Sequence, residues 1–251
     1  NLDNILIGRV WGTEALGLYA RAYSLLMLPI NAIRGPIDAV AFPAMSKLQD
    51  RPEDYRTYTR QVVKIIAFLS MPLTAFLGVS AREAIALALG PGWEEVATLF
   101  MIIAIAAFIQ PVSSVGRQVM LSSGNSARYV RWAIAYGAMI SSTFIVSVSW
   151  GTKGVAIAYA MVNLLVFYPS LTYSLKGTDV CPRDIVRSLA RPAITSLCGA
   201  LSVFLLKLMP AFGNGGNITS LLENFFIFVP VFVACNATTL QGRKDIGKFW
   251  S

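Results

Sequence analysis

Apolar residues gather into stretches that carry few charges and recur at roughly even intervals along the chain. Each stretch is about 20 residues long, the length at which a helix crosses a bilayer, so the pattern predicts a polytopic membrane protein. The stretches lack the alternation that is typical of barrel strands, and backbone groups in hydrocarbon need internal partners. We therefore expect an all-α fold, with spans at 1–10, 18–45, 62–89, 97–121, 129–150, 155–175, 189–209 and 218–239.

Composition gives the same picture. Hydrophobic residues make up 55% of the 251 residues, charged residues make up 14%, and the mean hydropathy is +0.61. Such a chain has too few polar side chains to cover a soluble globule of this size. The lipid bilayer is therefore the expected solvent for most of the surface.

The first predicted span, 1–10, has only about half the length of a complete crossing. It begins at Asn1. We therefore expect the chain to open inside a truncated helix and to depend for its insertion on helices upstream.

Basic residues alternate between the two predicted sides of the membrane. One side holds 15 of the 21 Lys and Arg residues, in the connections after the second, fourth and sixth spans and in the C-terminal tail. The opposite side holds four, and Arg21 and Arg34 lie inside the second span. By the positive-inside rule, we expect the side with more basic residues, including the C-terminus, to be cytoplasmic.

The net charge of +8 follows from these basic loops, which meet anionic membrane lipids. A nucleic-acid partner is therefore not expected. The three cysteines, Cys181, Cys198 and Cys235, are odd in number and predict no disulfide framework.

Several catalytic chemistries are excluded by residue types that the sequence lacks. It contains no His, which removes Ser-His and Cys-His nucleophile systems and histidine-based metal sites. Three scattered cysteines do not make a zinc site, and the sequence contains no Walker-type phosphate loop. We expect a protein that is not an enzyme, binds no metal and needs no cofactor.

A polar stripe follows the second predicted span. Ser24, Asn31 and Asp38 recur every seven residues with Arg34 between the last two, so all four share about a quarter of the helix circumference. Arg34 and Asp38 are spaced i, i+4 and can pair, whereas a lone charge at this depth costs about 2.5–3.5 kcal/mol. Two interpretations are open: a neutralised pair that fixes helix packing, or the wall of a water-filled cavity that binds a ligand.

The fourth predicted span carries a similar stripe. Gln110, Ser113, Ser114 and Arg117 follow the spacing i, i+3, i+4, i+7, and Pro111 beside them predicts a bend. The bend at Pro111 either acts as a gate or only shapes helix packing. Arg117 either belongs to the polar stripe or extends its side chain to the cytoplasmic interface. We expect the charged residues of the two stripes, together with Gln110, to face one another or one shared cavity.

Other spans carry fewer polar residues. Asp3 lies at or near the middle of the membrane in the first span, and Asn163 gives the sixth span a polar face suited to helix-to-helix contact.

Pro29, Pro36 and Pro43 predict that the second span is bent and divided into segments. Aromatic residues near span ends are expected to be interfacial anchors, namely Tyr19, Tyr23, Trp93 and Trp150.

Several short motifs resemble one family of membrane transporters. They are Asn1-Leu2-Asp3-Asn4, Leu6-Ile7-Gly8-Arg9, Tyr19-x-Arg21-Ala22-Tyr23, Phe42-Pro43-Ala44-x-Ser46-x-Leu48-Gln49, Gln110-Pro111 with Gly116, and Ser123-Gly124-Asn125. Over most of 1–172 the chain is similar to the polysaccharide transporter family. These proteins are the lipid-linked oligosaccharide flippases of the multidrug/oligosaccharidyl-lipid/polysaccharide exporter superfamily. By this resemblance, 1–49 corresponds to the family's seventh and eighth helices, and the chain to its C-terminal half.

The resemblance implies a V-shaped transporter whose two lobes alternate between inward-open and outward-open states. Residues 1–176 would form the C-terminal lobe, with six spans of which the first is truncated, and 177–251 a terminal helix pair and cytoplasmic tail. The implied substrate is an undecaprenyl-diphosphate-linked oligosaccharide, moved across the bacterial inner membrane for capsule, exopolysaccharide or O-antigen (lipopolysaccharide) assembly. Membrane lipids and the polysaccharide polymerase and export machinery are the implied partners.

The chemistry of that substrate implies roles for individual residues. A diphosphate in hydrocarbon needs cationic donors, and the planar fork of Arg matches phosphate oxygens. We expect Arg34 and Arg117 to bind it, with Arg21 at the mouth of the cavity. The sugar hydroxyls suit four polar residues, Asn31, Gln110, Ser114 and Asn163. Asp38 and Asp3 are candidates for proton or cation coupling.

Three other functions stay open. A drug/cation antiporter of the same superfamily would favour acidic and aromatic cavity walls, whereas here at least as many Arg as Asp lie at depth. A membrane-embedded glycan polymerase or ligase would need a sizeable outer loop with acid and base residues, and the predicted outer connections are short. A scaffold in an export complex would have no use for buried polar stripes.

Overall fold

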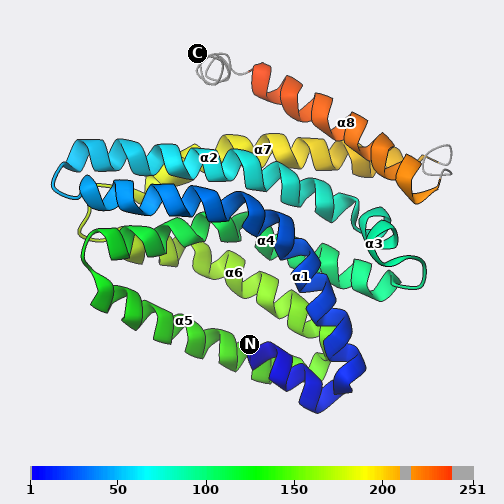
Figure 1. Ribbon diagram of the computed structural model, residues 1–251. Helices are drawn as coiled ribbons and strands as arrows, with labels where there is room; N and C mark the ends of the chain where they lie inside the picture. The colour runs from blue at the N-terminus through cyan, green and yellow to red at the C-terminus, as the bar shows by residue number, and fades with distance from the viewer. Residues whose placement is uncertain (1, 210–215, 239–251) are drawn as a thin grey trace.

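The structure, a computed structural model, describes residues 2–209 and 216–238, and side chains from residue 7 onward. The described residues form an all-helical bundle (Figure 1) made of α1 (Leu2–Lys47), α2 (Pro52–Val79), α3 (Ala81–Leu89), α4 (Glu94–Ser122), α5 (Ser126–Ser147), a short 3₁₀ helix (Val148–Trp150), α6 (Gly151–Leu175), α7 (Pro182–Lys207) and α8 (Asn217–Ala237). Six of the described segments are long and apolar enough to cross a membrane, with α5 and α6 counted as one segment. The predicted all-α membrane bundle is confirmed.

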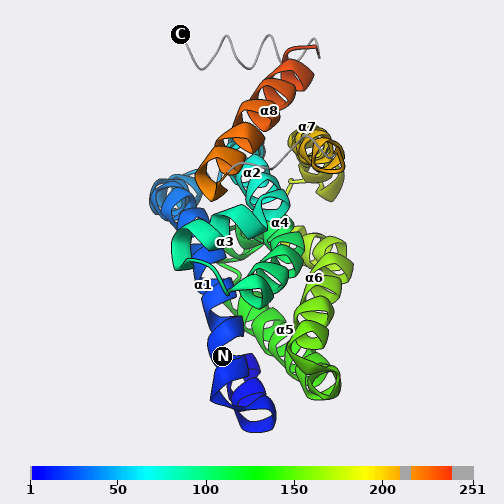
Figure 2. The same cartoon turned by 90° about the vertical axis from the view of Figure 1, so that its right-hand side faces the viewer.

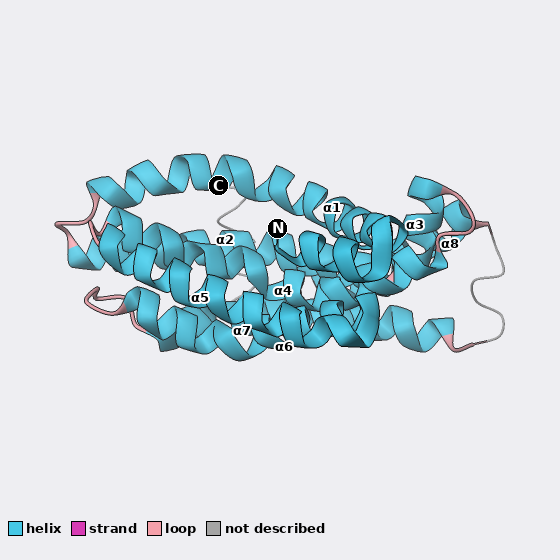
Figure 3. Ribbon diagram, turned by 90° about the horizontal axis from the view of Figure 1, so that it is seen from below, coloured by secondary structure: helices cyan, strands magenta, loops and turns pink. Residues whose placement is uncertain are grey.

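Most helices run along one common direction, which is plain when the bundle is seen from below (Figure 3). Figure 1 shows that α1 ends, α2 begins and α4 ends at the same end of the bundle, which we call the α1–α2 end. The opposite end carries α3 and is called the α3 end. Within the described residues, the connections after α1, α4 and α6 all lie at the α1–α2 end, and most of the predicted excess of basic residues lies in the helix ends beside them.

The first two predicted spans belong to one helix, α1, which is interrupted at Gly12. Gly12 has φ 87° and ψ 175°, a conformation that favours glycine because it has no Cβ. A Cβ added to Gly8 would lie 3.0 Å from Cδ2 of Leu16. Eight residues of continuous helix would separate these positions by about 12 Å, so the chain folds back at Gly12. The sequence predicts a connection of seven residues, 11–17, between the first two spans. This is wrong, because only Gly12 departs from helical geometry and it alone reverses the chain.

The three prolines of α1 do not divide it. Pro29, Pro36 and Pro43 lie inside the helix, and the interruption is at Gly12 instead. The helix is nevertheless bent (Figure 1), as expected where prolines remove backbone hydrogen bonds. The prediction of a bend is confirmed, and that of separate segments is wrong.

The predicted span 62–89 is two helices, because the chain breaks at Ser80 between α2 and α3. The break is held by the two C-terminal helices. Lys207 of α7 donates from Nζ to the carbonyl of Val79 at 2.9 Å and to Oε1 of Glu83 at 2.6 Å. Asn224 of α8 donates from Nδ2 to Oγ of Ser80 at 3.1 Å. Buried donors and acceptors freed by the break thus find partners on α7 and α8.

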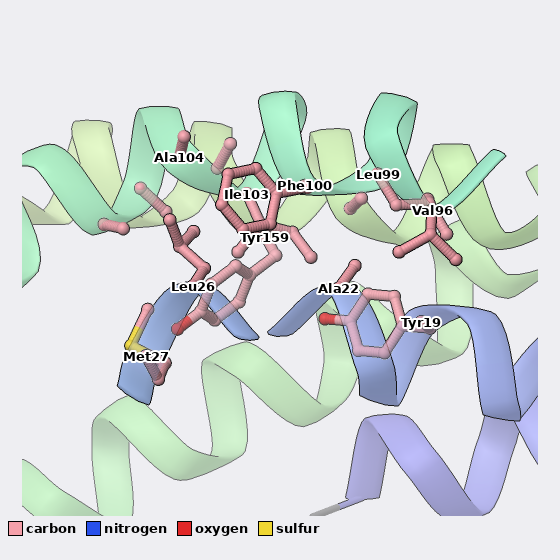
Figure 4. Packing of buried hydrophobic residues seen from close by; sticks show 14 of the residues in the cluster. Tyr19, Ala22, Leu26, Met27, Val96, Leu99, Phe100, Ile103, Ala104 and Tyr159 are labelled. Atoms are coloured by element: carbon pink, nitrogen blue, oxygen red, sulfur yellow. The ribbon is translucent and has the colours of Figure 1, made fainter. Parts of the chain in front are cut away.

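Two apolar clusters form the core. One joins α1, α4 and α6 (Figure 4), where Leu26 of α1, Ile103 of α4 and Tyr159 of α6 pack together. The other joins the last part of α1 to α2, α4 and α7, with Met45 and Ile66 buried in it. Figure 2 shows α7 and α8 on the side of the bundle away from α5. The division of the chain at 176/177 stays a prediction.

Tyr19 corrects one expectation from the sequence. Its side chain is 1% exposed and packs in the α1–α4–α6 cluster (Figure 4), so it is a core residue and not an interfacial anchor. Tyr19 was expected at the membrane interface because it is next to the predicted start of the span at residue 18. In the structure α1 already begins at Leu2, so Tyr19 lies well inside the helix.

Gly116 lies where α4 packs closely against α6. A Cβ there would lie 2.8 Å from Oγ and 3.0 Å from Cβ of Ser174. We expect Gly116→Ala to push the helices apart and to lower the free energy of unfolding by roughly 1–3 kcal/mol. Thermal unfolding of the detergent-solubilised full-length protein would measure this.

Gly137→Ala is the matched control. Gly137 is an exposed glycine of α5 with open space around its Cβ position. The same substitution there should be neutral or stabilising by up to about 1 kcal/mol, because alanine is the better helix former. Equal effects at the two glycines would contradict the close packing of α4 on α6.

Candidate functional site

The candidate site lies where α1 packs against α4. On α1, Nε of Arg34 donates to Oδ2 of Asp38 at 2.9 Å, across one helical turn. The two side chains are 24% and 23% exposed, which makes this a half-buried ion pair. The i, i+4 spacing read from the sequence therefore produces the predicted contact.

Two residues of α4 complete the site. Gln118 donates from Nε2 to Oδ1 of Asp38 at 2.5 Å, and Nη2 of Arg117 lies 4.0 Å from Oδ2 of Asp38. Gln118 is 4% exposed, whereas the Arg117 side chain is 42% exposed. We call Arg34, Asp38, Arg117 and Gln118 the Asp38 cluster.

The Asp38 cluster carries more positive than negative charge. Asp38 is one carboxylate between two guanidinium groups, so the three ionisable side chains sum to one positive charge. The carboxylate holds the Arg34 guanidinium by a hydrogen bond and attracts that of Arg117 from 4.0 Å, so the more exposed Arg117 is able to meet a ligand. Guanidinium forks bind phosphate oxygens in pairs, so the cluster has the chemistry of an anion site inside a membrane bundle.

Gln110 lies in a different polar network, between α4, α5 and α6. Its Nε2 donates to the hydroxyl of Tyr159 at 2.9 Å. Asn163 donates from Nδ2 to the Tyr159 carbonyl at 2.8 Å and accepts from the Tyr136 hydroxyl at 3.0 Å. Gln110 is therefore held by Tyr159 of α6 and not by Arg34 or Arg117, and the expectation that it shares one cavity with them stays a prediction. The contacts of Asn163 match the predicted helix-to-helix use.

The other predicted residues are dispersed. Ser114 donates to the carbonyl of Pro111 at 2.6 Å, inside its own helix, and Asn31 lies on an exposed part of α1. The Arg21 guanidinium stacks 4.6 Å from the centre of the Trp93 ring, toward the α3 end. Asp3 lies outside the residues whose side chains are described. Within the part of the chain that the structure describes, no group of His, Cys, Asp or Glu side chains could hold a metal ion.

Gln118 was missed in the sequence, although a signal for it exists. It lies eight residues after Gln110 and four after Ser114, so it continues the same helical stripe by one more turn. An aromatic group on α5 and α6 was also missed. Trp132 has ring centroids 6.1 Å from Tyr136 and 5.4 Å from Tyr173, and its i, i+4 spacing to Tyr136 could have indicated it.

Comparison with known proteins finds similarity to proteins of polysaccharide biosynthesis. A family model described as "Polysaccharide biosynthesis protein" matches residues 1–98. The chain is 29% identical over 185 residues to the teichuronic acid biosynthesis protein TuaB of Bacillus subtilis (strain 168), which covers 70% of this chain and 37% of that protein. It is 24% identical over 196 residues to an uncharacterised membrane protein in the cps region of Klebsiella pneumoniae, covering 76% and 40%.

A further match is the amylovoran biosynthesis protein AmsL of Erwinia amylovora, at 20% identity over 53% of this chain and 34% of that protein. No solved structure matches the chain. The chain spans less than half the length of the curated relatives that it matches. The match of residues 1–98 and the relatives named for polysaccharide biosynthesis support the resemblance predicted from the sequence, and the long apolar helices indicate a multi-pass membrane protein.

Proposed function

We propose that this chain forms the C-terminal half of a flippase. Its substrate is an oligosaccharide linked to undecaprenyl diphosphate, which crosses the bacterial inner membrane for assembly of a capsule, exopolysaccharide or lipopolysaccharide. Two relatives are named for the biosynthesis of teichuronic acid and of amylovoran, and the matching family model is described as a polysaccharide biosynthesis protein. Flipping makes and breaks no covalent bond, so the proposed protein is a transporter and not an enzyme.

The observation that carries the proposal is the Asp38 cluster. A diphosphate headgroup must leave water to cross the bilayer, and its negative charge needs compensation on the way. The cluster offers two guanidinium groups against one carboxylate, and Arg117 is partly exposed. We assign headgroup binding to Arg34 and Arg117, with Asp38 orienting both.

The same cluster separates this proposal from a drug/cation antiporter. A site for a cation needs an excess of carboxylate, whereas Arg34 and Arg117 outnumber Asp38. If one guanidinium turned from Asp38 to the bound diphosphate, the carboxylate would be left less neutralised. Proton or cation coupling at Asp38 is therefore part of the proposal. A glycan polymerase or ligase would need acid and base residues on a large loop, and the described connections between helices are short.

The proposed orientation places the α1–α2 end in the cytoplasm. The helix ends and connections there carry most of the basic residues of the described chain, which the positive-inside rule assigns to the cytoplasmic side. The Asp38 cluster then lies in the cytoplasmic half of the bundle, since Asp38 is nine residues, or about 14 Å of helix, from Lys47. It is placed to receive a headgroup from the inner leaflet, and the polymerase and export machinery would take the product outside.

Single cysteines test the orientation. In the full-length protein with its native cysteines replaced by serine, Glu53→Cys and Ser126→Cys should not react with a membrane-impermeant maleimide in intact cells. Ser149→Cys and Met209→Cys should react. All four residues are exposed, so a difference in labelling reports the side of the membrane and not burial. Permeabilised cells, in which all four should react, are the control. The reverse pattern would overturn the orientation.

Substitution of Arg34 tests the transport role. In the full-length protein, Arg34→Ala should leave insertion intact, because removal of a charge lowers the cost of insertion. Polymer export should fall by about tenfold or more, the effect of losing roughly 1.4 kcal/mol, and lipid-linked repeat units should accumulate. Arg34→Lys should restore only part of the export, since the charge returns without the bidentate fork.

Two further variants separate substrate binding from a structural ion pair. A structural pair predicts wild-type export in the double variant Arg34→Ala with Asp38→Ala, because both buried charges are then gone. Substrate binding predicts that the double variant stays inactive. Arg131→Gln is the matched control for charge, since Arg131 is exposed near the same end of the bundle and donates to the carbonyl of Ala127 in its own helix. It should export normally.

A further inference from the structure

A polar pocket lies at the α3 end, far from the Asp38 cluster. Its volume is about 270 Å³, and it is formed by α3, the connection from α3 to α4, and the first turns of α4 and α8. Its polar and aromatic lining consists of Arg82, Glu83, Trp93, Glu94, Asn217 and Ser220. We call it the α3–α8 pocket.

The lining is mixed in a way that suits a carbohydrate. It combines carboxylates, which accept hydrogen bonds, with a guanidinium, which donates them, and with an amide and a hydroxyl, which do both. Sugar hydroxyls also donate and accept. The indole of Trp93 adds an aromatic face, whose negative π-system attracts the C–H groups on one face of a sugar ring. A pocket for a hydrocarbon tail would instead be apolar.

Glu83, which lines the pocket, has one oxygen without a hydrogen-bond partner. Its Oε1 accepts from Lys207 at 2.6 Å, whereas Oε2 is buried and has no hydrogen-bond partner. A buried carboxylate oxygen without a donor costs free energy, and a small rotation of the side chain toward the pocket would let a ligand hydroxyl supply the donor. The ion pair with Lys207 keeps Glu83 at the wall of the pocket.

Trp93 is held in place as well. The Arg21 guanidinium of α1 lies 4.6 Å from the centre of its ring, a cation–π contact. Small-molecule pockets usually measure about 300–1,000 Å³, so the α3–α8 pocket, at about 270 Å³, is just below that range and is sized for no more than one monosaccharide unit.

The position of the pocket agrees with the length of the proposed substrate. Arg21 and Arg34 lie on the same helix, 13 residues or about 20 Å apart. A headgroup at the Asp38 cluster would therefore leave a chain of a few sugars to reach toward the α3 end. Asn217 and Ser220 belong to α8, so the C-terminal helix pair would supply one wall of this pocket.

We infer that the α3–α8 pocket binds one sugar unit of the transported oligosaccharide, with Trp93 stacking on the ring and Glu83 and Glu94 accepting its hydroxyls. The inference rests on the proposed function, which supplies the oligosaccharide. With the proposed orientation, the pocket faces the outer side of the membrane and holds the sugar as it leaves.

Protection of a cysteine from labelling tests the inference. The full-length protein would carry Asn217→Cys at the pocket, with its native cysteines replaced by serine. Free glucose, N-acetylglucosamine and glucuronic acid at millimolar concentration are the probes. At least one should slow maleimide labelling by about threefold, as expected for a weak ligand at about twice its Kd. Met209→Cys, which is exposed and does not line the pocket, should be labelled at an unchanged rate.

Three substitutions then identify the recognising groups. Trp93→Ala and Glu94→Gln should each remove the protection, and Trp93→Phe should keep part of it because an aromatic face remains. Quenching of tryptophan fluorescence by the same sugars gives a second readout that needs no cysteine, and it should be lost in Trp93→Phe. Both readouts stay interpretable if one variant folds poorly.

Two results would overturn the inference. One is a labelling rate that none of the sugars changes, and the other is protection that survives in Trp93→Ala. Neither touches the proposed function, which depends on export in the Arg34 variants. Loss of export in Arg34→Ala with no sugar protection at Asn217→Cys would therefore leave a flippase without this pocket in its path.

Discussion

The cost of a charged side chain in hydrocarbon governs the arrangement of this bundle. A lone charge near the middle of a membrane helix costs about 2.5–3.5 kcal/mol, so each charge at depth needs a partner or water. Arg34, Asp38 and Arg117 meet this need together, since α1 and α4 pack so that one carboxylate lies between two guanidinium groups. The contact between α1 and α4 is thus both an apolar interface and an electrostatic one.

The same constraint acts at the break between α2 and α3. There the chain frees the Val79 carbonyl and places Glu83 in a largely buried position, and Lys207 of α7 donates to the carbonyl and neutralises the carboxylate. Asn224 of α8 adds a hydrogen bond to Ser80. The two C-terminal helices are therefore fastened to the bundle through polar contacts at the α3 end, where hydrophobic attraction between lipid-exposed helices is weak.

Much of the fold could be predicted from the sequence, because span length and hydrophobicity are local properties. The ends of α5, α6, α7 and α8 lie within a few residues of the predicted ends, except that α7 begins at Pro182 and not near 189. The break at Ser80 could not be predicted, since its partners Lys207 and Asn224 are more than 100 residues away. Tyr19 was misplaced for a related reason: which face of α1 is buried depends on α4 and α6.

The candidate site was predicted in part. The pairing of Arg34 with Asp38 follows from i, i+4 spacing on one helix, whereas the contacts of Asp38 with Arg117 and Gln118 depend on how α1 and α4 pack. Spacing alone put Gln110 and Arg117 on one stripe, but α4 contacts different helices along its length. Gln110 therefore meets Tyr159 of α6, two turns away from the Asp38 cluster.

The central claim is that Arg34 and Arg117 recognise a diphosphate, and direct binding tests it. Farnesyl diphosphate and farnesol share a tail, so their affinities for the purified full-length protein isolate the contribution of the headgroup. The account predicts that the wild type prefers the diphosphate by about tenfold or more, or roughly 1.4 kcal/mol, and that this preference is lost in Arg34→Gln with Arg117→Gln but kept in Arg131→Gln. An unchanged preference in the double variant would contradict it.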